Sequence, residues 1–263
     1  MCLELSIAFY QKMSEARSSP SVSDVFMSYV EDQMQQFECG AHDASHMHRV
    51  ADMALHIASK CEGSVNTQVV YVAALLHDML DSKLVHEDEM EKREQDLRLL
   101  IDKEMKDNLT AVEVDLIFDI VKSVGYKNMI RDDWKPETMS VEYRCVQDAD
   151  LLDAIGNIGV ARCYAFGGKR KRALFTVVEE GNDKLTPEQY KASKGSGVEH
   201  FFDKLLRIKD MMTTNTGREI ALSRHKRMCD YLIGIDEEIK ETAGTNNKNE
   251  QSVLGKRLAS FLV

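Results

Sequence analysis

Apolar positions along the chain recur every three or four residues, which is the spacing of one face of a helix. This pattern predicts a series of helices separated by glycines and polar stretches. Residues 139–166 fit either one long helix or two abutting ones, and residues 174–196 look irregular, with one short helix after Thr186-Pro187. The expected helices span about 21–37, 46–58, 65–80, 86–108, 110–125, 139–166, 198–212 and 214–239.

The helical pattern predicts an all-α protein, and the presence of only three prolines in 263 residues favours the same class. One domain of this length is within the range of compact chains. We expect residues 40–241 to form a single globular core. Residues 1–39 would be an N-terminal helical extension packed on it, and residues 242–263 a flexible linker followed by a short C-terminal segment.

Composition narrows the class of protein. A hydrophobic fraction of 43% and a charged fraction of 30% suit a soluble globular chain, and no apolar window is long enough to predict a membrane span. The N-terminus lacks a secretory pattern, and six cysteines without a CxxC pair are typical of reduced thiols, so we expect a cytoplasmic protein. The net charge of −10 argues against a nucleic-acid scaffold, but it allows a basic pocket for a phosphorylated small molecule.

The candidate chemistry begins where an apolar run, residues 71–76, ends in the pair His77-Asp78. A buried imidazole and carboxylate both need partners. A divalent metal ion would satisfy both, and a hydrogen-bonded structural pair is the alternative. His46 lies on the apolar stripe of the preceding helix and offers a second imidazole, although a histidine on such a face is more often a structural core residue.

Three aspartates, Asp148, Asp150 and Asp153, stand among core-like residues of the segment 139–166. With the imidazoles they would make a mixed nitrogen and oxygen site for Mn²⁺, Mg²⁺, Fe²⁺ or Zn²⁺. Side chains two residues apart on a helix diverge by about 200°, so Asp148 and Asp150 are not both expected to be ligands. Apolar spacing slightly favours Asp148 as the more inward residue, and the residues alone leave the choice open.

Several motifs resemble those of the HD superfamily of metal-dependent phosphohydrolases. Residues 42–50, HDASHMHRV, resemble H-D-x-x-H-x-x-R-V, and residues 73–83, AALLHDMLDSK, resemble A-A-L-L-H-D-x-x-D-x-K. Residues 146–156, VQDADLLDAIG, resemble V-Q-D-A-D-R-L-D-A-I-G, and residues 200–206, HFFDKLL, resemble a later H-F-x-x-K-L-L helix. The likeness covers about residues 40–240. It is greatest to small bacterial-type nucleoside-triphosphate pyrophosphohydrolases.

This resemblance implies an HD-domain helical bundle with one divalent metal ion per chain, held by His46, His77, Asp78 and Asp150. Mn²⁺ is favoured, with Mg²⁺, Fe²⁺, Ni²⁺ or Zn²⁺ as alternatives. The ion would polarise a phosphoryl oxygen and lower the pKa of a bound water. The chain departs from the family pattern at Leu151, which replaces the Arg or Lys common after the ligand aspartate. One phosphate contact of the relatives is therefore absent.

Further residues are candidates for catalysis and substrate binding. Asp81 would be the general base or would position the attacking water. The alternative for Asp81 is a helix-end salt bridge with Lys83. Lys83, Arg49 and Lys204 would neutralise phosphate charge, unless Arg49 only supports the acids through hydrogen bonds. His200 would contact the substrate or orient a neighbouring group.

The resulting prediction is a phosphohydrolase that acts on a nucleotide or a related phosphorylated small molecule. Conversion of a (d)NTP to a (d)NMP and pyrophosphate is the favoured reaction. A nucleoside 5′-monophosphatase, a phosphodiesterase and a non-catalytic nucleotide-binding module are the alternatives. A dinuclear oxidative enzyme is disfavoured, because only His86 lies between the His-Asp pair and the last aspartates. No membrane partner is expected, and a homodimer is compatible with the sequence.

Overall fold

The computed structural model describes residues 22–34, 44–81, 85–176, 195–242 and 253–262. These residues form helices and no strands, so the prediction of an all-α protein is confirmed. The α-helices are α2 (Val22–Met34), α3 (Ala44–Ala58), α4 (Thr67–Leu76), α5 (Met90–Met105), α6 (Ala111–Ser123), α7 (Tyr126–Met129), α8 (Val141–Asp153), α9 (Gly156–Lys169), α11 (Gly197–Asp203), α12 (Asn215–Thr242) and α13 (Val253–Ala259). The 3₁₀ helices are η1 (Glu87–Glu89), η2 (Pro136–Thr138) and η3 (Leu205–Met211).

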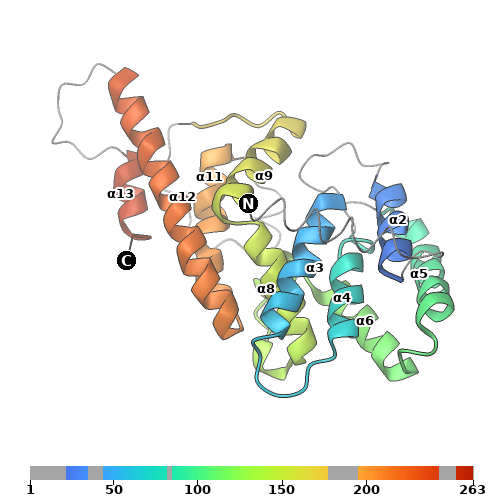
Figure 1. The fold of residues 1–263 in the computed structure, drawn as a ribbon. Helices are drawn as coiled ribbons and strands as arrows, with labels where there is room; N and C mark the ends of the chain where they lie inside the picture. The colour runs from blue at the N-terminus through green and yellow to red at the C-terminus, as the bar shows by residue number, and fades with distance from the viewer. Residues whose placement is uncertain (1–21, 35–43, 82–84, 177–194, 243–252, 263) are drawn as a thin grey trace, which may run out of the picture.

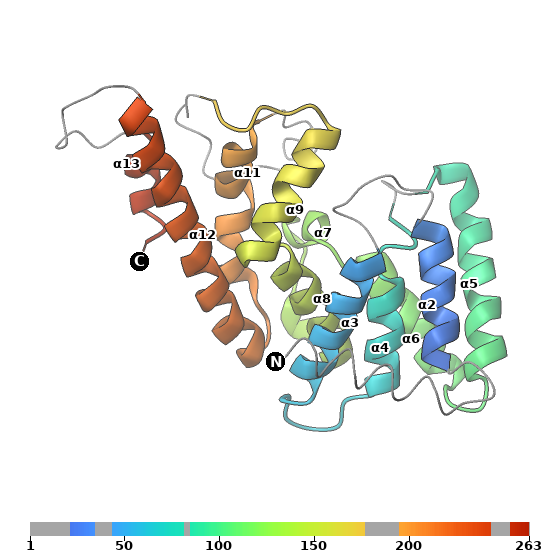
Figure 2. The same cartoon turned by 45° about the horizontal axis from the view of Figure 1, so that its top comes forward.

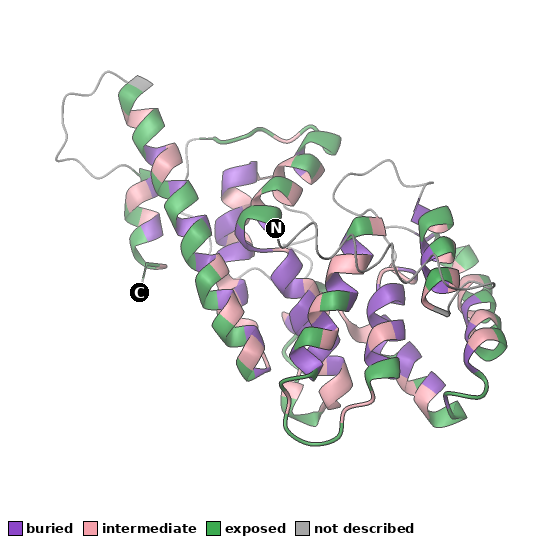
Figure 3. Ribbon diagram, viewed as in Figure 1, coloured by how far each residue is buried: buried purple, intermediate pink, exposed green. Residues whose placement is uncertain are grey.

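Three helices form the centre of the fold. Helix α3 packs against both α4 and α8, and α6 packs against α4. Figures 1 and 2 show α3, α4 and α8 side by side, with α2 and α5 on one flank and α12 on the other. Helix α12 contacts α8, α9, η3 and α13. The buried faces of these helices turn towards one another (Figure 3), and they form one continuous hydrophobic core.

Local sequence explains where the central helices begin. Asn66 caps α4, because its side-chain oxygen accepts hydrogen bonds from the backbone N–H groups of Gln68 and Val69. From Val69 to Leu76, helix α4 then buries every residue except the half-buried Tyr71, as expected of an element covered on most sides. Ser140 caps α8 by accepting from the N–H of Tyr143. These caps fix the starts of α4, which leads directly into His77 and Asp78, and of α8, which carries Asp150.

The observed helix ends differ from the periodicity in two places, and they decide between two alternatives in a third. Helix α4 ends at Leu76 rather than near residue 80, and residues 77–80 form a turn. The segment 139–166 forms two helices, α8 and α9, rather than one long one, and Gly156 at the junction has a φ of +74°, which favours glycine. The expected helix 198–212 is interrupted at Lys204, whose φ of −139° and ψ of −62° are not helical.

Parts of the predicted organisation fall outside the described residues, namely residues 1–21, most of the linker 242–252, and the short helix expected after residues 186–187. Of the expected N-terminal extension, α2 is described, and it packs against α3 and α4. In the described part of the chain, none of the helices combines the length and the apolar character needed to cross a membrane.

Candidate metal centre

The candidate ligands come from one end of the three central helices. His46 lies in the first turn of α3, and His77 and Asp78 directly follow α4. Asp150 lies in the last turn of α8. The packing of α3 on α4 and α8 brings these four side chains, which span more than 100 positions of sequence, into one cluster.

Both imidazoles direct the Nε2 atom towards the two carboxylates. Nε2 of His46 lies 3.6 Å from Oδ2 of Asp78 and 3.6 Å from Oδ1 of Asp150. Nε2 of His77 lies 3.5 Å from Oδ1 of Asp78 and 3.6 Å from Oδ1 of Asp150. The two histidine side chains are 1% and 2% exposed, whereas Asp78 is 14% and Asp150 is 21% exposed. The cluster is therefore reached from the carboxylate side.

The Nδ1 atom of each histidine makes a hydrogen bond on the side away from the carboxylate cluster. Nδ1 of His77 lies 2.8 Å from the carbonyl oxygen of Ala74, and Nδ1 of His46 lies 2.8 Å from Oδ2 of Asp153. A carbonyl and an ionised carboxylate can only accept, so each Nδ1 carries the hydrogen. In the neutral rings, both Nε2 lone pairs then face the carboxylates. Such an orientation of histidine by its other nitrogen is typical of metal ligands.

The donor set fits a divalent cation. Separations of 3.5–3.6 Å between nitrogen and oxygen are longer than ordinary hydrogen bonds. Ligand atoms about 2.1 Å from a shared cation stand about 3.0–3.5 Å apart, which is close to these values. Within the described residues, Nε2 of His77 is buried and has no hydrogen-bond partner. His46, His77 and Asp150 could together ligate a metal ion.

The electrostatics of the cluster also favour a positive charge at its centre. Burial disfavours the protonated form of His77, but the carboxylates of Asp78 and Asp150 outweigh it and raise the pKa of His77 to about 9. Burial likewise opposes ionisation of Asp150. His77, His46 and Arg162 outweigh it and hold the pKa of Asp150 well below its usual range. Without a metal ion, a proton on His77 occupies this favourable field.

Asp153 supports the cluster, a role that sequence reasoning missed. Its carboxylate accepts from Nδ1 of His46, from Nε and Nη2 of Arg49, at 2.8 and 3.0 Å, and from Nη1 of Arg162 at 2.8 Å. Burial raises the pKa of Asp153, but the donors on these three residues outweigh it and hold the pKa well below its usual range. Asp153 follows Asp150 by three residues on α8, so helical spacing could have indicated a shared face.

Asp148 has a different role from Asp150. It is fully buried, as apolar spacing predicted, but its carboxylate accepts hydrogen bonds from the N–H and hydroxyl groups of Thr213 and Thr214. The hydroxyl of Thr214 in turn accepts from the N–H of Gly217. Asp148 thus anchors the start of α12, while Asp150 faces the histidines.

The other candidate residues near the His-Asp pair lie as follows. Asp81 is half-buried at the end of the turn, where its N–H donates to the carbonyl of Asp78. Lys83 falls outside the described residues, so the alternative salt bridge with Asp81 is not described either. Arg49 is engaged by Asp153, which agrees with the interpretation that Arg49 supports an acid.

His200 lies on α11, and Lys204 directly follows that helix. Nζ of Lys204 lies 4.9 Å from the ring centroid of Tyr126. Burial, followed by the charges of Lys204 and Arg172, lowers the pKa of His200 to about 3. His200 is therefore a neutral imidazole beside two cations, and an anionic group at this place would meet a positive field.

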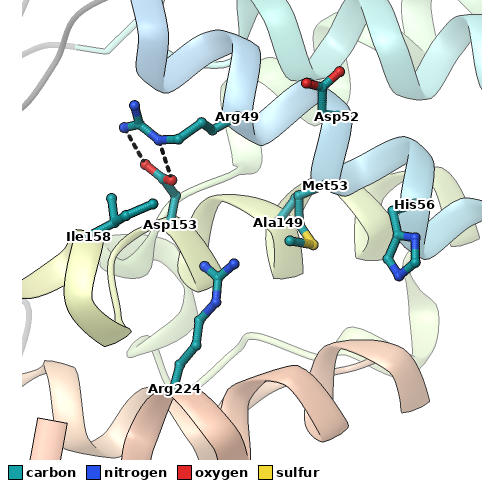
Figure 4. A pocket seen from close by; sticks show the side chains of 8 residues that line it. All are labelled: Arg49, Asp52, Met53, His56, Ala149, Asp153, Ile158 and Arg224. Atoms are coloured by element: carbon teal, nitrogen blue, oxygen red, sulfur yellow. Dashed lines mark hydrogen bonds and ion pairs between the residues drawn. The ribbon is translucent and has the colours of Figure 1, made fainter. Parts of the chain in front are cut away.

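A pocket of about 250 Å³ lies between α3, α8, α9 and α12. Arg49 and Asp153, joined by their hydrogen bonds, line one part of it, and Arg224 reaches towards it from α12 (Figure 4). Nη1 of Arg224 donates to the carbonyl of Leu152 at 2.5 Å. None of its lining residues is one of the four candidate ligands. The pocket therefore lies next to Asp153 and Arg49, which hold His46 in place, and not next to the ligands themselves.

Comparisons with known proteins place these observations in a family. Residues 43–155 match the HD domain. YpgQ of Bacillus subtilis is 33% identical over 202 residues, which cover 77% of this chain and 86% of that protein. Its crystal structure in complex with ADP has a TM-score of 0.60 and 31% identity, and covers 82% of this chain and 97% of that one.

Two further solved structures are similar. A protein from Lactobacillus plantarum has a TM-score of 0.68 and 28% identity, with coverage of 82% of this chain and 95% of that chain. A protein from Bacillus thuringiensis, described as an HD-superfamily hydrolase, has a TM-score of 0.57 and 29% identity, and covers 84% and 96% of the two chains. The likeness extends over nearly the whole length of each relative.

Proposed function

This chain belongs to the HD-domain family, and on that premise we propose that it is a metal-dependent phosphohydrolase that acts on a nucleotide. The favoured reaction is hydrolysis of a (d)NTP to a (d)NMP and pyrophosphate. The observation that carries the proposal is the convergence of two Nε2 lone pairs, from His46 and His77, on two carboxylates. Relatives support the substrate class, because YpgQ was crystallised with ADP and another relative is described as a hydrolase.

We assign the four ligands to His46, His77, Asp78 and Asp150, which would hold one divalent ion, with Mn²⁺ favoured over Mg²⁺, Fe²⁺, Ni²⁺ and Zn²⁺. When bound, such an ion polarises a phosphoryl oxygen and lowers the pKa of water. The two histidines are held by partners on their far nitrogens, so they need little reorganisation to act as ligands. The more exposed carboxylates lie on the side from which substrate would approach.

We assign proton transfer to Asp81. It follows the ligand Asp78 by three residues and is half-buried, and its N–H donates to the carbonyl of Asp78. A water molecule would attack the α-phosphorus, its proton would pass to the Asp81 carboxylate, and the bond from the α-phosphorus to the bridging oxygen would break. Pyrophosphate would leave with that oxygen, and the nucleoside monophosphate would retain the oxygen of water.

Positive side chains would neutralise the charge of the substrate's phosphates. Lys204 and His200 lie in a positive field that includes Arg172, which suits an anionic group. Lys83 is proposed for the same purpose from its motif position. Arg49 is better suited to hold Asp153, and through it His46, because two of its nitrogens already bind that carboxylate.

The test is a substrate panel with product identification by mass. Metal-depleted protein is incubated with Mn²⁺ and with (d)NTPs, nucleoside monophosphates or cyclic nucleotides, in water enriched in ¹⁸O. The proposal predicts pyrophosphate release and one ¹⁸O atom in the monophosphate. Asp150→Asn should abolish turnover, whereas Asp119→Asn, at an exposed position of α6, should not.

Other outcomes would change the assignment. Release of inorganic phosphate from monophosphates alone would favour a 5′-monophosphatase, and opening of cyclic nucleotides would favour a phosphodiesterase. Tight nucleotide binding without turnover under every metal would favour a non-catalytic binding module. If neither turnover nor binding occurs with any member of the panel, the proposal fails.

A further inference from the structure

A second pocket, of about 380 Å³, lies where the loop before α8 meets η3 and the start of α12. Its size falls in the range of small-molecule sites, about 300–1,000 Å³. It shares no lining residue with the candidate metal centre. Along α8, its residue Arg144 precedes Asp150 by six positions, or about 9 Å of helix rise. A ligand in this pocket would therefore bind at a site separate from the candidate metal centre.

Arg144 is the unusual member of this pocket. Its guanidinium is permanently charged, and its half-buried side chain lines the cavity. The Nε atom is buried and has no hydrogen-bond partner within the described residues. Buried polar groups are nearly always paired, so this guanidinium, whose Nε is buried and unpaired and whose side chain lines the cavity, is suited to an anionic acceptor from outside the chain. A carboxylate or phosphate matches the planar fork of donors that guanidinium presents.

Apolar groups form another part of the wall. The indole of Trp134 is half-buried, Met212 is buried, and Met211 and Pro136 are partly covered. Nε1 of Trp134 donates to the hydroxyl of Tyr143 at 3.4 Å, which restrains the ring. An aromatic ring held at a cavity offers a flat surface to a planar ligand, and the thioethers adapt to its shape.

The remaining charges limit the kind of anion. Arg218 adds a second guanidinium, partly engaged by the side chain of Asn215 and the carbonyl of Thr213. Glu137 and Asp210 add two exposed carboxylates. Two cations and two anions leave the lining without net charge, so the pocket is unsuited to a polyanion such as a triphosphate. A ligand with one anionic group would satisfy Arg144 without meeting strong repulsion.

We propose that this pocket binds a small organic anion that carries a flat ring and one carboxylate or one phosphate group. The anionic group binds Arg144 and Arg218, and the ring packs on Trp134 and the methionines. Either an aromatic carboxylate or a nucleoside monophosphate supplies this chemistry. The proposal does not depend on the hydrolase activity, since the pocket and the metal cluster have no residue in common.

Trp134 is the only tryptophan in the sequence and lines this pocket, so tryptophan fluorescence is a direct probe of binding here. The full-length protein is titrated with AMP, benzoate, adenosine or inorganic phosphate, in the presence of EDTA to prevent turnover. We expect a saturable fluorescence change with AMP or with benzoate, and the effective one identifies the anionic group. Adenosine and phosphate each lack one of the two required parts, and should act at least 10-fold more weakly.

Substitutions locate the contact. Arg144→Gln should weaken binding at least 10-fold, whereas Arg227→Gln, at an exposed position of α12, should leave it unchanged. Equal binding by Arg144→Gln and wild type would overturn the proposal, as would the absence of a saturable change with both AMP and benzoate. Arg144→Met provides a second measurement. It should raise the thermal unfolding temperature of the ligand-free protein, and a lowered temperature would mean that the guanidinium already has its partners.

Discussion

Replacing Asp153 by Asn tests whether the support of His46 governs metal binding. The Asp153 carboxylate accepts from Nδ1 of His46 and from three guanidinium nitrogens of Arg49 and Arg162. An amide has one accepting oxygen and a donating nitrogen. If the oxygen keeps His46, the amide nitrogen faces the guanidinium donors. If it keeps the arginines, the amide nitrogen faces Nδ1 of His46 and disfavours the tautomer that directs the Nε2 lone pair at the cluster.

Asp153→Asn should lower both the metal affinity and the folding stability. Removing a partner that orients a metal-ligating histidine lowers metal affinity by about 10- to 100-fold. Breaking a fully buried charge pair costs about 3–5 kcal/mol of folding stability. Here the side chains of Arg49 and Arg162 are 35% and 15% exposed, so water compensates part of the loss. We therefore expect a loss of about 2 kcal/mol in the free energy of unfolding.

Metal affinity is measured by competition of Mn²⁺ with a chelating indicator, and unfolding by urea in the presence of EDTA. Asp133→Asn is the control, because this exposed aspartate also pairs with an arginine, Arg131, in the loop between α7 and η2. If Asp153→Asn binds Mn²⁺ as tightly as wild type does, the tautomer argument is wrong. If only stability falls, Asp153 is a structural partner of the arginines and nothing more.

Asp81→Asn should lower kcat at least 100-fold while the protein still binds one metal ion, because it removes the proposed base but no ligand; loss of the metal together with activity would contradict this role. Gly159→Ala should destabilise the protein by more than about 2 kcal/mol in urea, since the new Cβ would lie 2.2 Å from the carbonyl oxygen of Ala154. Gly168→Ala, where the Cβ meets nothing within 4 Å, should be neutral or stabilising. The pKa of His200 is about 3 in the folded protein and near 6.5 in the unfolded chain, so above pH 6.5 the residue is neutral in both states. As the pH falls from 6.5 towards 3, the unfolded chain binds a proton that the folded protein does not, and the free energy of unfolding decreases. The difference in urea midpoint between pH 7.5 and pH 5.5 should be smaller in His200→Gln than in wild type, and an equal difference would refute the assignment.

Periodicity predicted the presence of the central helices well, because their apolar faces are buried continuously. It predicted the helix ends less well. Beyond Leu76 the apolar pattern continues through the buried Met79, yet the backbone changes to turn hydrogen bonds such as that from Met79 N–H to the Leu76 carbonyl. Likewise, the apolar stripe of residues 198–212 continues through the interruption at Lys204. In both segments the spacing of apolar residues reflects which side chains are buried. A side chain can be buried from a turn as well as from a helix, so the spacing does not reveal where the helix is interrupted.

The candidate site also has a part that the sequence predicted, the ligands, and a part that it did not, the residues that support them. The positions of His46, His77, Asp78 and Asp150 follow from motifs that are each local in sequence, and these side chains do lie together. The partners that set the different roles of Asp153 and Asp148 are distant in the chain: His46 precedes Asp153 by 107 residues, and Thr214 follows Asp148 by 66. No spacing rule connects residues so far apart. Only the packing of α3 and α12 on α8 shows which aspartate supports a histidine and which one anchors a helix.

The proposed hydrolysis requires one divalent ion, held by the two histidines and two aspartates. Metal-free protein is titrated with Mn²⁺ while pyrophosphate release from a mixture of dNTPs is recorded. We expect a rate that rises linearly and becomes constant at one Mn²⁺ per chain. A rate that is independent of Mn²⁺, or one that becomes constant only at two per chain, would contradict this requirement.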